Sequence, residues 1–159
     1  MPAAGFASAL SAWAGAVTLL TIAEGRDDIG TTVSAFCPVS ADPPTVLISL
    51  LASGYPAEVL GRVDRFAVTL LSASQRSLAG RFAAAGRPAA RVMLSNVPYS
   101  RGQASGALIP AGGLAAIECE VNTRVAAADH VVFVADVVAA PYVAESGEPL
   151  IRFRGGYLR

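Results

Sequence analysis

The 159-residue sequence contains no lysine, a single histidine and few charged residues. Its twelve basic residues are all arginines, and they balance twelve acidic residues. The arginines form no stripe that could follow a phosphate backbone, which argues against nucleic-acid binding. A neutral chain with a few placed arginines suits a small anionic ligand better.

Cysteine and long apolar runs are also scarce. Cys37 and Cys119 lie far apart and have no metal-ligand spacing, so we expect two reduced thiols and no metal site. No run approaches the roughly 20 apolar residues of a membrane-spanning helix. A secretory signal begins with a basic segment, and this sequence has no basic residue before Arg26. We therefore expect a cytoplasmic protein without a membrane segment. Hydrophobic residues nevertheless reach 53%, which favours burial at a subunit interface.

The sequence lacks βαβ alternation and a GxGxxG motif after a strand, which argues against a Rossmann-type dinucleotide site. Instead, short apolar runs rich in β-branched residues are separated by turn residues. This pattern predicts strands at residues 16–23, 32–36, 45–51, 66–71, 114–124, 130–139 and 150–153. In the strand at 114–124, period-two alternation predicts one buried face and one solvent-facing side.

Helices are expected to be few and peripheral, at residues 6–14, 56–63 and 75–85. Ser72 and Gln75 form a capping-box pattern before the last of them. Residues 87–113 show little periodicity and are expected to form a long loop. Many strands with peripheral helices indicate a mainly β (β or α+β) barrel or sandwich, in one domain over residues 1–159.

Hydroxyl groups gather on two loops around residues 30–44, where Pro43 and Pro44 stiffen the second loop. Backbone N–H groups and hydroxyls beside a rigid strand are suited to a flat heterocycle with polar edges. The alternative is that these are ordinary turn and strand residues, but their clustering among few charges favours a ligand site. The hydroxyl residues concerned are Thr31, Thr32, Ser34 and Ser40.

Two segments are candidates for binding a phosphate. Ala52–Gly54 precedes an expected helix start, where free N–H groups favour an anion; simple capping by Ser53 is the alternative. Farther along, Gln75, Ser77 and Arg81 could reach a phosphate, Arg81 through its forked guanidinium. A solvated surface arginine is the alternative there.

The only histidine, His130, follows Asp129 at the entrance to an expected strand. The neighbouring carboxylate could orient the imidazole. His130 could then donate a hydrogen bond to a cofactor or contact an incoming substrate. A histidine with a purely structural role is the alternative.

Six segments in this order resemble the flavin reductase family, small reductases built on the FMN-binding split barrel. They are GAVTLLT (15–21), GTTVSAFCPVSADPPTVLISL (30–50), FAVTLLSASQRSLAGRFA (66–83), IECEV (117–121), ADHVVFVADVV (128–138) and PLIRFRGGYLR (149–159). The resemblance implies a homodimeric split β-barrel with flavin in a groove at the subunit interface. It also implies reduction of FMN or FAD by NADH or NADPH, often to supply a partner monooxygenase.

The resemblance also implies roles for individual residues. The backbone of Thr31–Ala35 and the Ser34 hydroxyl would contact the isoalloxazine, and the ribityl chain and phosphate would be held farther along. His130 matches the family's Gly-Asp-His motif near the nicotinamide and is the catalytic candidate. The residues implied in cofactor binding are Thr31, Thr32, Val33, Ser34, Ala35, Ser40, Ala52, Ser53, Gly54, Ser77, Arg81, Phe82, Asp129 and Tyr157.

One position departs from the family motif, since Ala128 stands where the family has glycine before Asp-His. If that position needs a positive φ, alanine strains the turn and displaces His130. A non-catalytic flavin-binding or electron-transfer protein on the same barrel is therefore the alternative to an NAD(P)H:flavin oxidoreductase. An oxidase of another small substrate is disfavoured, because no basic cluster dedicated to a second phosphate is evident.

Overall fold

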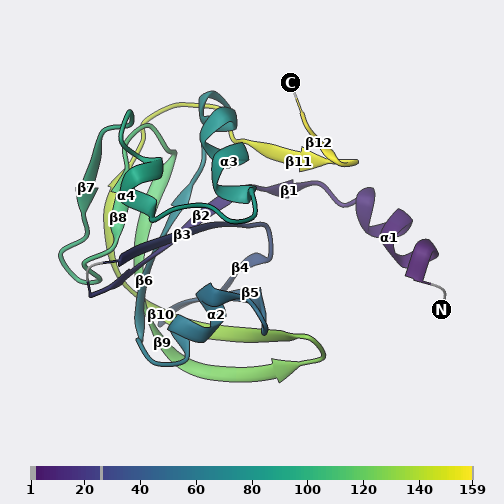
Figure 1. The fold of residues 1–159 in the computed structure, drawn as a ribbon, viewed down its shortest axis with the longest axis horizontal. Coiled ribbons are helices and arrows are strands. Elements are labelled where there is room, and N and C mark those ends of the chain that lie inside the picture. The colour runs from purple at the N-terminus through teal and green to yellow at the C-terminus, as the bar shows by residue number, and fades with distance from the viewer. Residues whose placement is uncertain (1–2, 26, 159) are drawn as a thin grey trace.

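A seven-stranded antiparallel sheet forms the body of the computed structural model, which describes residues 3–25 and 27–158 (Figure 1). The strand order is β3-β2-β6-β9-β10-β5-β4. The strands are β2 (Thr18–Glu24), β3 (Asp27–Val33), β4 (Phe36–Ala41), β5 (Pro44–Leu51), β6 (Arg65–Leu70), β9 (Ala115–Ala127) and β10 (His130–Val143). The predicted mainly β architecture is confirmed.

Two small sheets flank this body. β1 (Gly15–Ala16) pairs with β11 (Ile151–Phe153), and β11 pairs with β12 (Gly156–Tyr157). These pairings place β1, near the start of the chain, beside β11 and β12, near its end (Figure 1). β7 (Tyr99–Arg101) and β8 (Leu108–Pro110) form a separate hairpin.

The helices are short and peripheral, as predicted. They are α1 (Ala3–Ser11), α2 (Tyr55–Leu60), α3 (Arg76–Ala83) and α4 (Ala90–Met93), with a 3₁₀ turn η1 (Ala73–Gln75). The capping box is confirmed, because the Ser72 N–H donates to Gln75 Oε1 at 3.1 Å. α1 projects from the body with no buried residue (Figure 1). Within the described residues, no helix has the length and apolar character needed to cross a membrane.

Two apolar clusters hold the sheet and helices together. Inside the curved sheet, Phe66 and Phe133 pack with Ile48 and Leu60, all at most 1% exposed. A second cluster places Leu78 and Phe82 of α3 against β2. Burial of each such side chain stabilises the fold by roughly 1.5–3 kcal/mol. This packing holds α3 against the sheet, where it also contacts β3.

The prediction of a long loop at residues 87–113 was wrong. This segment contains α4, β7 and β8, and it buries Leu94, Leu108 and Ile109. The Arg101 guanidinium binds both carboxylate oxygens of the buried Asp28, at 2.7 and 3.0 Å. Short helices and strands held by such non-local contacts show little hydrophobic periodicity in their sequence. The hydrophobic pattern therefore did not predict them.

The prediction that one side of β9 faces solvent was also wrong. Ala116 and Glu118 are buried on the side that was expected to be wet. Glu118 Oε1 accepts hydrogen bonds from the Ala104 and Ser105 N–H groups and from the Ser105 hydroxyl, at 3.0, 2.7 and 2.7 Å. The segment before β8 therefore covers this side, and three donors compensate the burial of the carboxylate.

The predicted strand at 32–36 is divided in the structure. β3 ends at Val33, and β4 begins at Phe36. The proline loop is a tight connection between β4 and β5, in which the Asp42 N–H donates to the Ser40 hydroxyl at 3.2 Å. Ser40 therefore lies in β4 at the end of a hairpin, whereas it was expected on the proline loop itself.

The β9–β10 hairpin turns through two residues, Ala128 and Asp129, because Ala127 and His130 are paired. Ala128 has a φ of 53°, so the expectation that this position needs a positive φ is confirmed. Such turns favour glycine, since alanine is strained in this region. His130 nevertheless keeps its place in β10, where it pairs with Ala127 and with Leu51 of β5. The strand register thus holds His130 despite the strained turn.

We expect Ala128→Gly to raise the free energy of unfolding by about 0.5–1 kcal/mol, because the relief of left-handed strain exceeds the entropy cost of glycine. Urea unfolding would measure this gain. Ala127→Gly is the matched control, because it places glycine in the adjacent paired strand and should destabilise. If both variants lower the free energy of unfolding equally, Ala128 is not strained in the native protein.

Candidate functional site

A hollow of about 340 Å³ lies between the ends of β3 and β5 and is here called the β3–β5 hollow. It unites three segments that the sequence analysis selected separately: residues 31–35, Gly54 and His130. The remaining lining comes from the end of β5, the start of α2 and one arginine: Ser49, Leu50, Leu51, Pro56, Ala57 and Arg87. Segments far apart in the sequence thus meet at one site.

β3 is an edge strand of the seven-stranded sheet, so one side of its backbone has no neighbouring strand. Arg87 Nε donates to the Gly30 carbonyl at 2.7 Å, which shows that Gly30 turns its polar groups away from β2. Backbone groups alternate in direction along an antiparallel strand. Thr32, two residues on, therefore directs its N–H and carbonyl to the same free side, beside the hollow.

A close contact with α3 fixes this edge. A Cβ atom at Gly30 would collide with the ring of Phe82, so only glycine lets β3 approach α3 this closely. Phe82 is 1% exposed and packs beneath the strand. Its place in the structure is to support β3, whereas the resemblance implied a direct contact with the cofactor.

Arg87 stands at the junction of the β3–β5 hollow and a neighbouring hollow of about 500 Å³. Besides Gly30, it donates from Nη1 to the Ala84 carbonyl at 3.0 Å. Burial lowers the pKa of this guanidinium, yet an arginine stays charged at neutral pH. This residue was not among those predicted from the sequence. The feature of the sequence that could have identified Arg87 is a single arginine between Gly86 and Pro88, in the turn after α3.

His130 lines the hollow with its side chain 45% exposed. Its Nδ1 lies 2.7 Å from Asp129 Oδ1, and this hydrogen bond lowers the pKa of the Asp129 carboxyl. An ionised carboxylate accepts only, so Nδ1 carries the proton in this contact. Nε2 is then left for a ligand. Asp129 is 79% exposed and orients the ring from outside the hollow.

Several residues implied in cofactor binding lie elsewhere. Ser77 and Arg81 are exposed on α3, where Arg81 Nη1 donates to the Met93 carbonyl at 3.1 Å. Tyr157 packs under the Arg76 guanidinium, with 5.2 Å from Cζ to the ring centre. The Gln75 side chain is occupied by the Ser72 N–H and the Ala111 carbonyl.

The connection between β5 and α2 borders the hollow through Gly54. Ala52 and Ser53 are exposed in the same connection. Gly54 is the N-cap of α2, and no side chain caps that helix, so the alternative of capping by Ser53 is wrong. The roles implied for Ala52 and Ser53 stay predictions.

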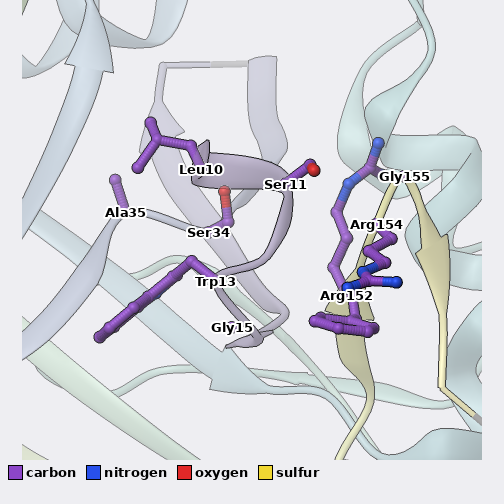
Figure 2. A pocket seen from close by; sticks show the side chains of 10 residues that line it. Leu10, Ser11, Trp13, Gly15, Ser34, Ala35, Arg152, Arg154 and Gly155 are labelled. Atoms are coloured by element: carbon purple, nitrogen blue, oxygen red, sulfur yellow. The ribbon is translucent and has the colours of Figure 1, made fainter. Parts of the chain in front are cut away.

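A further hollow of about 410 Å³ adjoins the site and is here called the α1–β11 hollow (Figure 2). Ser34 and Ala35 line it as well as the β3–β5 hollow. Its other lining residues come from the end of α1, the segment before β1, and β11 with its following turn: Leu10, Ser11, Trp13, Gly15, Arg152, Phe153, Arg154 and Gly155. The Ser34–Ala35 segment thus separates two hollows.

The donor set of the β3–β5 hollow fits a flavin. Small walls at Ala35, Gly54 and Ala57 leave space for a flat ring system. The free edge of β3 and the hydroxyls of Thr31 and Thr32 match polar ring edges. Arg87 matches a phosphate.

Comparison with known proteins agrees with this geometry. The chain matches the family described as flavin reductase like domain over residues 10–159. It is 32% identical over 141 residues to the NADH-dependent FMN reductase AsuE2 of Streptomyces nodosus subsp. asukaensis, covering 89% of this chain and 76% of that protein. It is 30% identical over 154 residues to the reductase component of 4-hydroxyphenylacetate 3-monooxygenase from Thermus thermophilus, covering 97% and 94%.

A solved structure gives the same result in three dimensions. The NADH:FAD oxidoreductase SgcE6 of Streptomyces globisporus C-1027, in complex with NAD and FAD fragments, superposes with a TM-score of 0.90 at 27% identity. The match covers 98% of this chain and 91% of that one. On the sequence match and on the fold, this chain belongs to the flavin reductase-like domain family.

Proposed function

We propose that this protein reduces FMN or FAD with NADH and that the β3–β5 hollow holds the flavin. The observation that carries the proposal is the meeting of a free strand edge, Arg87 and His130 in one hollow. The relatives named as NADH-dependent FMN and FAD reductases support the choice of substrate and reductant. When bound, the flavin supplies the chemistry by accepting a hydride from the nicotinamide.

The protein's own part is to bind and orient. The Thr32 backbone and the hydroxyls of Thr31 and Ser34 would hold the polar edge of the ring. Arg87 would hold the phosphate. The small residues at Ala35 and Gly54 would let the ring lie flat against the strand and keep water from its face.

His130 would contact the reacting rings through Nε2, which accepts a hydrogen bond when the neutral imidazole carries its proton on Nδ1. Asp129 keeps its Nδ1 protonated and its ring oriented, so Nε2 faces the ligand. Neither a nucleophile nor a metal is required for this role, and the residue touches the bound molecules directly. Its absence should therefore slow turnover while the flavin still binds.

NADH consumption by the purified protein, with FMN or FAD added in turn, tests the proposed function. We expect NADH to be oxidised only when a flavin is present, because hydride transfer needs both rings in the hollow. Riboflavin, which lacks the phosphate that Arg87 would bind, should require a higher concentration. A flavin that co-purifies without any NADH oxidation would instead favour the flavin-binding alternative.

Arg87→Gln and His130→Ala should have separable effects. We expect Arg87→Gln to weaken FMN binding about tenfold, since a charge-assisted contact is lost. His130→Ala should lower kcat or raise the KM for NADH about tenfold or more, with FMN affinity unchanged. Flavin fluorescence titration and steady-state kinetics measure the two effects. Equal effects of both variants on FMN binding would contradict the assigned roles.

We also propose that two copies pair through the face that carries the β3–β5 hollow. Directly paired residues share a face of the sheet, which places Leu51 and Val125 on the same face as His130. Both apolar side chains are 48% exposed there. A second copy would cover them and close the hollow, in agreement with the flavin groove that the resemblance places between subunits.

Sedimentation of the 16.2 kDa chain tests this pairing. We expect a dimer for the native protein and a shift toward monomer for Val125→Glu, because a buried charge disfavours the interface. Val143→Glu, at the far end of β10 where the side chain is 73% exposed, is the control and should stay dimeric. A native monomer would refute the pairing.

The reductase component of a two-component system supplies reduced flavin to its monooxygenase, and relatives of this chain bear such names. A partner monooxygenase is therefore the proposed consumer of the reduced flavin here. A cytoplasmic location stays a prediction.

A further inference from the structure

The α1–β11 hollow has walls that are tied together by the backbone (Figure 2). Gly15 pairs with Arg152 across β1 and β11. The Arg154 N–H donates to the Ser11 carbonyl at 2.9 Å, which joins the end of α1 to the C-terminal hairpin. The hollow is thus built from segments near both ends of the described chain.

One wall of this hollow is cationic. Arg152 and Arg154 stand two residues apart, and Figure 2 shows both side chains on the same side of the hollow. Within residues 3–25 and 27–158, neither forms an ion pair with a carboxylate. Two neighbouring guanidinium groups present forked donors that match the oxygens of a diphosphate.

The opposite wall is apolar and aromatic. Trp13 is 77% exposed, and Figure 2 shows it with Leu10 and Ala35 across the hollow from the arginines. An indole with a free face is a stacking surface for a purine base. An aromatic wall facing a pair of arginines is the arrangement that recognises an adenine carried on phosphates.

The α1–β11 hollow lies beside the β3–β5 hollow, so its arginines and Trp13 could bind the far part of a molecule that reacts at His130. Ser34 and Ala35 line both hollows, so the two hollows adjoin at this segment. Within the β3–β5 hollow, Arg87 lies on the side shared with the neighbouring hollow and is assigned to the flavin phosphate under the proposed function. A dinucleotide with its reactive ring at His130 would therefore need a cation for its diphosphate elsewhere.

We propose that the α1–β11 hollow binds an adenosine diphosphate group, with Arg152 and Arg154 on the diphosphate and Trp13 stacked on the adenine. NADH and FAD both carry this group. Its use in catalysis rests on the proposed flavin reductase function, whereas binding of ADP itself does not. The basic pair that the sequence analysis did not recognise is thus assigned to a second ligand segment.

Binding can be measured directly, because Trp13 is the only tryptophan in the chain. We expect ADP to quench its fluorescence saturably in the flavin-free protein. Arg152→Gln and Arg154→Gln should each weaken the apparent affinity for ADP about tenfold. Arg91→Gln removes one exposed arginine on α4 and is the control that should leave ADP binding unchanged.

Kinetics then identify which molecule brings the group. With FMN as the flavin, the arginine variants should raise the KM for NADH about tenfold, without changing the KM for reduced nicotinamide mononucleotide, which lacks the adenylate half. If FAD is the source, the variants instead weaken FAD binding and leave FMN binding unchanged. Either pattern supports an adenosine diphosphate site, and each names its source.

The proposal is overturned if ADP gives no saturable quenching, or if the arginine variants bind ADP as well as the native protein. It is also overturned if Trp13 emits as a buried indole before ADP is added, because a covered indole cannot stack on a base. Loss of NADH oxidation with intact ADP quenching would refute only the reductase function, so the two failures are distinguishable.

Discussion

The free side of β3 is the constraint on which the candidate site depends. An edge strand offers backbone donors and acceptors, and such edges are normally covered because they invite pairing with other chains. Here the first half of β3 is covered by α3, α4 and Arg87, whose Nε binds the Gly30 carbonyl. The second half, from Thr31 onward, is left beside the hollow. The same strand is thus anchored at one end and available to a ligand at the other.

Buried polar contacts extend this constraint to the segment between α3 and β9. Arg101 binds Asp28 at the start of β3, and Glu118 gathers the donors of residues 104–105. Each buried carboxylate is compensated by its own partners, so loss of either partner would leave an unpaired buried charge. Both contacts hold the segment that begins at Arg87 against the barrel. Arg87 itself is held by the Gly30 and Ala84 carbonyls.

Local signals predicted much of the fold. The short apolar runs rich in β-branched residues and the Ser72–Gln75 capping box are properties of neighbouring residues, and the structure confirms strands at those runs and the capping box. The wrong predictions concern contacts between distant segments: the cover over Glu118 and the order within residues 87–113. Arg87 was missed for the same reason, because its partner Gly30 lies 57 residues away. Residues 31–35, Gly54 and His130 were selected one by one, and only the sheet brings them together.

The strained turn at Ala128 shows how stability and function are separated here. A positive φ at alanine costs roughly 1–2 kcal/mol, and strain next to a functional residue often signals a constraint of the site. The imidazole, however, is located by strand register: His130 lies between Ala127 and Leu51, and Asp129 fixes its ring. The departure from glycine therefore lowers stability without moving the histidine. This removes the main physical ground for a barrel that binds flavin but cannot use it, since that alternative required a displaced His130.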